Sequence, residues 1–371
     1  MRAASARVVI PSLAMSSDAI DSETIIVRED ETFDEPTVAA YLHEHLEGAA
    51  GAMEVRQFGG GHANLTYLLR FAGEGEPREF VLRRPPLGPV AKGAHDMKRE
   101  FEALSRLWRV FEPAPRAFLF CDDLDVIGAE FLVMERRHGV VIRSVVPPVF
   151  GGGTDAAANR KISEVVIDTL ADFHEVDPVA VGLEFLGRPD GFLQRQVQGW
   201  GDRYERAKTN DHVGPADLVR WLEANLPESL PATLLHNDWK LDNMAVAEHD
   251  PGRCVAVYDW DMCTVGDPLC DLGTVLCSWR DQADTGEGVP GAMPWGDGFL
   301  IAEEGARRYC ERRGIDPALV PYYRVFGIFK MGVVIQQIYV RYHRGQTQDE
   351  RFKVMEPLAI ALFERALQLR P

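Results

Sequence analysis

Side chains that could bind a metal ion and a phosphate are concentrated in one stretch of the chain, residues 234–274. Two short apolar, β-prone runs in this stretch look like buried strand ends, and polar residues follow each of them. These residues are His236, Asp238, Lys240 and Asn243 after the first run and Asp259 and Asp261 after the second. Carboxylate and amide oxygens on neighbouring strand ends, with a lysine nearby, suit Mg²⁺ and phosphate better than zinc or iron. The stretch therefore predicts magnesium-assisted phosphate chemistry.

The spacing of these residues is more specific than their types. Asp238 and Asn243 form the pattern H-x-D-x-x-x-x-N with His236, and Asp259 comes sixteen residues after Asn243, at the end of an apolar run. The kinase catalytic loop has this pattern: its Asp accepts the proton of the substrate hydroxyl, and its Asn and the later Asp hold Mg²⁺. The pattern alone is equally consistent with a polar loop containing an N-cap and a solvated turn. The continuations Y-D-W-D and G-D-P-x-x-D-L-G favour the kinase loop.

With these continuations the segment resembles the aminoglycoside phosphotransferase and choline kinase-like family, which is written HGD-x-x-x-x-N, I-D-W-x and G-D-P-x-x-D-L. Asn237 replaces the usual glycine, at a position that also varies among protein kinases. The resemblance covers about residues 35–365. It implies an α+β, bilobal protein-kinase-like fold with a small β-rich N-lobe and a larger, mainly helical C-lobe.

The sequences at residues 83–86, 187–197 and 221–227 resemble those of one branch of this family. That branch includes the kinase-like domains fused to some acyl-CoA dehydrogenases, which are thought to phosphorylate hydroxyacyl-CoA compounds. A hydroxyacyl-CoA therefore joins the aminoglycosides and other alcohols as a candidate acceptor.

Composition sets wide limits. The chain has 371 residues, enough for two domains or one bilobal unit, with 46% hydrophobic and 26% charged residues. Its net charge is −17, but eleven acids and one base fall between Asp18 and Glu54, so this segment alone carries −10. We interpret it as a solvated face, and we expect neither nucleic-acid binding nor a membrane span. The six cysteines contain no C-x-x-C pair, which favours free thiols and a cytoplasmic protein.

Three segments are expected along the chain. Residues 1–33 are predicted to be a disordered tail, residues 34–138 the nucleotide-binding N-lobe, and residues 139–371 the C-lobe with the catalytic loop, metal site and substrate-binding helices. Apolar periodicity predicts a helix at residues 35–46 and strands at 53–58, 65–71 and 79–83.

The N-lobe contains candidate nucleotide ligands. Gly59, Gly60 and Gly61 lie between two strands, where their amides could approach phosphates, although such a cluster is also an ordinary turn. The resemblance implies a nucleotide-covering loop here, G-G-x-x-N, and Asn64 fits its last position. Arg83 stands where kinases place the lysine that binds the α- and β-phosphates. Arginine keeps the charge but is larger, which is the main departure from the family pattern.

A helical glutamate should orient that cation. The amphipathic segment 95–108 offers Glu100 and Glu102, and the family wording R-E-x-x-x-L assigns the position to Glu100. The resemblance also makes Met134, Glu135 and Arg136 the hinge whose backbone would bind an adenine.

The resulting hypothesis is a kinase that uses ATP and Mg²⁺ to phosphorylate a hydroxyl of a small molecule. Asp238 would be the base, with His236 and Lys240 also catalytic and Asn243 and Asp259 as metal ligands. Asp271 could brace the loop or simply be an acid in the first turn of a helix, and Asp261 and Asp267 receive no role. The alternative is a pseudokinase that binds nucleotide without transfer, which only Arg83 favours. The oligomeric state is not indicated by the sequence.

Overall fold

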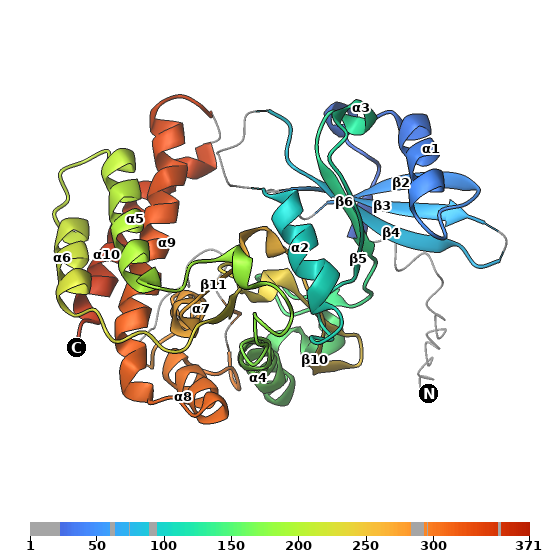
Figure 1. Cartoon of the computed structure of the whole chain (residues 1–371). Helices are drawn as coiled ribbons and strands as arrows, with labels where there is room; N and C mark the ends of the chain where they lie inside the picture. Colours follow the sequence, from blue (N-terminus) through green and yellow to red (C-terminus); the bar gives the residue numbers. More distant parts are fainter. Residues whose placement is uncertain are drawn as a thin grey trace, which may run out of the picture. The chain divides into compact units, whose positions relative to one another are not determined.

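The computed structural model describes residues 23–59, 64–73, 75–88, 95–282, 293–294, 296–347 and 350–371. The chain divides into two compact units (Figure 1). The first contains the chain up to residue 91 together with residues 119–134, and the second contains residues 92–118 and 135–371. The predicted lobe boundary after residue 138 lies close to the crossing at Met134, whereas residues 92–118, which we assigned to the N-lobe, belong to the second unit.

The first unit is built on a six-stranded sheet with the order β1-β2-β3-β4-β6-β5. Its strands are β1 (Thr24–Ile25), β2 (Ala52–Phe58), β3 (Leu65–Ala72), β4 (Arg78–Arg84), β5 (Ala117–Cys121) and β6 (Phe131–Glu135). β2, β3 and β4 are successive antiparallel neighbours, as expected for strands joined by short connections. Two helices, α1 (Glu35–His45) and α3 (Leu124–Ile127), contact each other. The predicted strands and the predicted N-lobe helix α1 are present, with ends shifted by a few residues.

The disordered tail predicted for residues 1–33 is wrong for its last part. β1 pairs with β2, and Tyr67 donates a hydrogen bond to the carbonyl of Glu31 at 2.6 Å. The backbone N–H of Arg28 also donates to Gln57 at 3.0 Å. The prediction failed because local acidic composition carries no information about pairing with a strand some thirty residues further along the chain. Residues 1–22 lie outside the described part.

The second unit is mainly helical. Its helices are α2 (Met97–Leu107), α4 (Ala156–Phe173), α5 (Phe192–Ala207), α6 (Gly214–Ala224), α7 (Pro268–Leu276), α8 (Ala302–Arg313), α9 (Val320–His343) and α10 (Met355–Gln368). α9 contacts α5, α6, α7 and α10, so it is the centre of this unit. A segment around it, Pro317–His343, is long and apolar enough to cross a membrane, but 67% of its most apolar window is buried inside the protein.

Helices α7 and α9 cross at two glycines. A Cβ on Gly273 would lie 2.1 Å from the carbonyl oxygen of Tyr323, and one on Gly327 would lie 2.1 Å from that of Gly273. Only glycine permits such an approach of two helix backbones. The crossing packs α7 at Gly273 against the first half of α9, which contains Tyr323 and Gly327.

Short strands carry the loops of interest. β8 (Thr233–Leu235) pairs with β11 (Thr264–Gly266), and β9 (Met244–Ala247) pairs with β10 (Asp250–Val257) and with β7 (Val140–Val141). The loop at residues 236–243 connects β8 to β9, and the loop at 258–263 connects β10 to β11. Both loops therefore start or end on paired strands.

Candidate active site

Three of the predicted site residues meet in the loop between β8 and β9. The Asp238 carboxylate oxygen Oδ2 accepts hydrogen bonds from Lys240 Nζ at 2.7 Å and from Asn243 Nδ2 at 2.9 Å. The same Asn243 amide donates to the backbone carbonyl of Asp238 at 2.9 Å. Burial acts to lower the pKa of Lys240, but the carboxylate of Asp238 outweighs it and the pKa is raised. The Lys240 side chain is therefore a protonated ammonium that forms an ion pair with the Asp238 carboxylate.

His236 is the first residue of this loop, and its side chain points into the protein core. Its side chain is fully buried, Nε2 donates to the carbonyl of Tyr258 at 2.9 Å, and Nδ1 accepts the backbone N–H of Asp238 at 3.2 Å. Burial lowers the pKa of this imidazole, so it is neutral with its proton on Nε2. Both ring nitrogens are occupied by backbone groups, and the predicted catalytic role of His236 stays a prediction. It positions the loop.

Asp271 anchors the start of the loop from below. Its carboxylate accepts the backbone N–H of His236 at 2.6 Å and that of Asn237 at 2.9 Å, and His174 Nε2 lies 3.5 Å away. Burial alone would raise the pKa of Asp271, but the hydrogen bonds from His174 and the His236 amide lower it. Asp271 is thus ionised and, of the two roles that the sequence left open, it fills the bracing one.

Asn237 adopts a left-handed backbone conformation, with φ of 67°. This explains the usual glycine at the position, because few other residues adopt it without cost, and asparagine is among those that do. The Asn237 side chain is also used: Nδ2 donates to the carbonyl of Met262 at 3.0 Å. It therefore links the loop after β8 to the loop after β10.

Asn243 and Asp259 occupy the same edge of the β9–β10 pair. Met244 pairs with Val257 at the end of the ladder, and the backbone N–H of Tyr258 donates to the carbonyl of Asn243 at 2.8 Å. Asp259 follows directly, with φ of 70°. Within the described residues no group of three or more His, Cys, Asp and Glu side chains could hold a metal. One carboxylate and one amide fit Mg²⁺, which keeps waters and binds substrate phosphates in place of a full protein cage.

Glu100 reaches this region from α2. Its Oε1 accepts the backbone N–H of Trp260 at 3.4 Å, and the glutamate is fully buried. Trp260 is the residue after Asp259, and its ring contacts that of His236 at 4.8 Å between centroids. α2 therefore packs on the loop that carries Asp259.

The predicted nucleotide ligands fall in separate parts of the structure. Gly60 and Gly61 lie outside the described residues. Gly59 directly follows β2, Asn64 is buried just before β3, and Arg83 is buried in β4, all in the first unit. Because Arg83 and Glu100 belong to different units, their pairing stays a prediction.

The predicted hinge coincides with the change of unit. Met134 is the last residue of the first unit, and Glu135 and Arg136 begin the second. The Glu135 carboxylate accepts the backbone N–H of Arg116 at 3.1 Å and lies 3.0 Å from Arg137 Nε. The first contact ties Glu135 to Arg116, the residue just before β5, and the adenine-binding role stays a prediction.

Sequence reasoning missed Lys330. This lysine of α9 is 8% exposed, and its Nζ donates to the carbonyl of Asn237 at 3.1 Å and to Thr274 Oγ1 at 3.5 Å. A lone lysine within the apolar run VFGIFKMGVVIQQIYV was the available signal.

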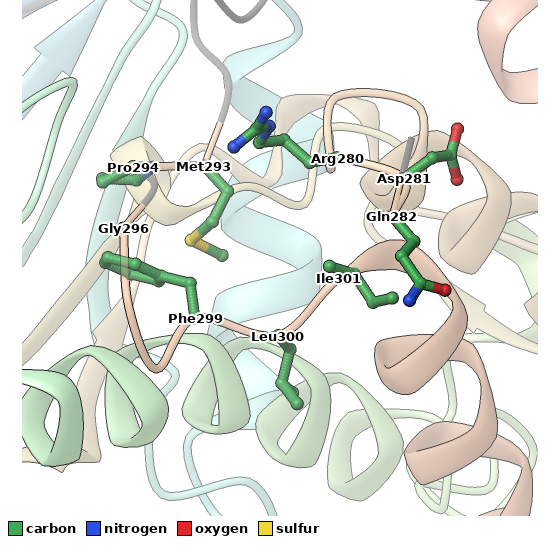
Figure 2. Close-up of a pocket in the computed structure, with 9 residues that line it drawn as sticks. All are labelled: Arg280, Asp281, Gln282, Met293, Pro294, Gly296, Phe299, Leu300 and Ile301. Carbon is green, nitrogen blue, oxygen red and sulfur yellow. The ribbon is translucent and has the colours of Figure 1, made fainter. Parts of the chain in front are cut away.

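A cavity of about 200 Å³ lies elsewhere in the second unit. Figure 2 shows its nine lining residues, among them Met293, Phe299 and Ile301. None of the predicted site residues lines it, and residues 283–292 lie outside the described part.

The two-unit α+β architecture and the Asp238–Lys240–Asn243 loop define the class of kinase-like phosphotransferases. Residues 54–311 match the profile of the phosphotransferase enzyme family, and the chain belongs to this family. The resemblance inferred from the motifs is therefore confirmed.

Comparison with known proteins agrees with this class. Acyl-CoA dehydrogenase family member 11 of Gallus gallus is 32% identical over 365 residues, covering 95% of this chain and 45% of that protein. The chain thus spans about half the length of the curated relatives it matches, and the predicted branch is confirmed. A crystal structure from Ralstonia eutropha, provisionally assigned as an aminoglycoside phosphotransferase, has 26% identity and a TM-score of 0.75, covering 92% of this chain and 100% of that one.

A more distant solved structure shows the same fold. A thermostable mutant of aminoglycoside phosphotransferase APH(4)-Ia, in ternary complex with AMP-PNP and hygromycin B, has 16% identity and a TM-score of 0.55. The alignment covers 90% of this chain and 98% of that one. The predicted kinase-like fold is therefore confirmed.

Proposed function

We propose that the protein is a small-molecule kinase that transfers the γ-phosphoryl group of ATP to an alcohol. The observation that carries this proposal is the Asp238 carboxylate, held by Lys240 at 2.7 Å and Asn243 at 2.9 Å above a buried neutral His236. A carboxylate that is held in this way by two hydrogen-bond donors is suited to orient a substrate hydroxyl and accept its proton. The AMP-PNP bound by the fold relative APH(4)-Ia supports nucleotide use.

In the transfer, the acceptor hydroxyl gives its proton to Asp238 while its oxygen forms a bond to the γ-phosphorus. The bond from that phosphorus to the β–γ bridging oxygen breaks, and ADP leaves with the electron pair. Lys240 places its positive charge next to Asp238, where charge on the migrating group develops. Asn243 and Asp259 would hold Mg²⁺, which neutralises phosphate charge when bound. Arg83, oriented by Glu100, would bind the α- and β-phosphates, with Gly59 and Asn64 in the covering loop and the 134–136 hinge at the adenine.

We propose that the acceptor is a hydroxyacyl-CoA rather than an aminoglycoside. The matched relatives are named acyl-CoA dehydrogenase family members, and the chain matches 45% of the Gallus gallus protein. An enzyme region joined to acyl-CoA chemistry is suited to act on an acyl-CoA bearing a hydroxyl. We place the protein in the cytoplasm, because all six cysteines are free and buried.

The test is ADP release from Mg·ATP with 4-hydroxybutyryl-CoA, hygromycin B, choline and glucose as acceptors. Asp238→Asn should lower the turnover rate by about a thousandfold or more, while AMP-PNP still binds. Asp250→Asn is the matched control, since it makes the same change at an exposed aspartate on β10. AMP-PNP binding with no turnover for any acceptor would favour the pseudokinase. Absence of nucleotide binding would reject both interpretations.

A further inference from the structure

Lys330 is a buried cation without a counter-ion. No carboxylate lies within ion-pairing distance of its Nζ in the described part of the chain, where its partners are the Asn237 carbonyl at 3.1 Å and the Thr274 hydroxyl at 3.5 Å. Removing an ammonium from water without an opposite charge is costly, so buried charges are normally paired. Asn237 is bonded directly to Asp238, which places this uncompensated charge one residue from the proposed base.

A second cation shares an aromatic ring with Lys330. Lys330 Nζ lies 5.7 Å from the centroid of Trp200, and the Arg203 guanidinium lies 4.3 Å from the same centroid. The indole of Trp200 is fixed by a hydrogen bond from Nε1 to Gln196 at 3.3 Å. Arg203 is exposed, and its pKa is lowered by burial of part of its side chain and by the charge of Arg206. A ring can offset only part of two positive charges.

The face of α5 next to this ring is open at Gly199. Gln196, Gly199 and Arg203 recur at helical spacing on α5, and a Cβ built on Gly199 would meet no atom within 4 Å. Arg195 of the same helix is less available, because it donates to the carbonyls of Asp190 and Arg188.

We propose that Trp200, Arg203 and Lys330 form an anion subsite that binds a carboxylate or phosphate group of the acceptor alcohol. This inference rests on the proposed kinase function and names the acceptor class of the same site. An oxyanion there supplies the charge that Lys330 lacks, and charge-assisted hydrogen bonds to Arg203 orient it. A polycation such as hygromycin B would face two positive charges and is rejected.

The test measures binding by titration calorimetry with saturating AMP-PNP and Mg²⁺. The probes are 4-hydroxybutyrate, which carries only a carboxylate, and 4-hydroxybutyryl-CoA, which carries phosphates. Lys330→Met and Arg203→Gln should each lower the affinity for the probe that binds by about tenfold or more. Arg220→Gln, which removes a 72% exposed arginine of α6, is the matched charge control and should leave both affinities unchanged. The probe that responds identifies the anionic group.

Two results would overturn the subsite: equal probe affinity in all variants, or wild-type protein that binds neither probe. Arg203→Gln alters an exposed side chain and keeps the test valid if Lys330→Met does not fold. Affinity for AMP-PNP is recorded in every variant and should change less than about twofold. A failure of the kinase function would instead appear as lost AMP-PNP binding, or as turnover unaffected by Asp238→Asn, while the calorimetric comparison of the variants still stands.

Discussion

Asp271 Oδ2 lies 2.6 Å from the backbone nitrogen of His236, so a buried carboxylate of α7 holds the first residue of the loop that carries Asp238. The second oxygen holds the next amide, that of Asn237, at 2.9 Å. With His236 bonded to Tyr258 and Asp238, the loop is fixed from the backbone rather than by the side chains that face a substrate.

Asp271→Asn should impair catalysis more than nucleotide binding. The substitution keeps the size but turns an NH₂ group toward a backbone donor, losing about 1.5–3 kcal/mol of charged hydrogen bonding. A displaced loop misplaces Asp238, so we expect kcat to fall roughly ten- to a hundredfold. Steady-state kinetics and AMP-PNP titration measure the two effects. Unchanged kcat would show that Asp271 has no influence on the geometry of Asp238.

Asn237→Ala should destabilise the protein more than Asn237→Gly does, although both substitutions remove the same side-chain hydrogen bond. Both remove the 3.0 Å bond to Met262, but only glycine adopts φ of 67° freely. Alanine should cost about 1–2 kcal/mol more than glycine. Thermal unfolding ranks the two variants, and equal melting temperatures would contradict the strain argument. The glycine variant should retain activity, because it restores the residue usual in the family.

The sequence predicted contacts between residues that lie close together along the chain, and it missed contacts between residues that lie far apart. Asp238, Lys240 and Asn243 fall within six residues, and Asp259 follows β10, which pairs with the preceding strand β9. Their spacing in the sequence was therefore enough to predict that they lie close together. Lys330 acts on a carbonyl 93 residues away, and only the packing of α9 on α7 reveals it. The burial of His236 was not predicted, because a position in a motif does not report burial. The β1 pairing was missed for the same reason: composition describes a segment, not its partner.

Gly273→Ala should destabilise the protein strongly. Its Cβ would lie 2.1 Å from the backbone of Tyr323, and a backbone atom cannot give way like the end of a flexible side chain. We expect a loss of about 3 kcal/mol or more, beyond the usual range for an overpacked core, because α7 and α9 must separate. Gly199→Ala is the matched control in α5. No atom lies within 4 Å of its Cβ, so it should stabilise by about 0.5–1 kcal/mol. Denaturant titration of both variants gives the comparison, and a neutral Gly273→Ala would contradict the described crossing.

Stability should fall as the pH drops below about 6.5, owing to two buried histidines. Burial lowers the pKa of His174 and of His236 in the folded protein. The unfolded chain takes up protons on these residues near pH 6.5 and the folded chain does not, so their contribution is complete above pH 6.5 and is lost on acidification. Each histidine can add a slope of up to about 1.4 kcal/mol per pH unit.

Unfolding free energies between pH 8 and pH 5.5 measure this slope directly. His174→Gln removes one of the two groups and should reduce the slope, whatever it does to stability at pH 8. His249→Gln changes an exposed histidine and should leave the slope unaltered. The slope is the informative quantity because loss of the His174 contact with Asp271 shifts stability at every pH, whereas only proton uptake by the unfolded chain makes it depend on pH. A slope retained in His174→Gln would mean that His174 takes up its proton without unfolding, and its neutral state in the core would then be wrong.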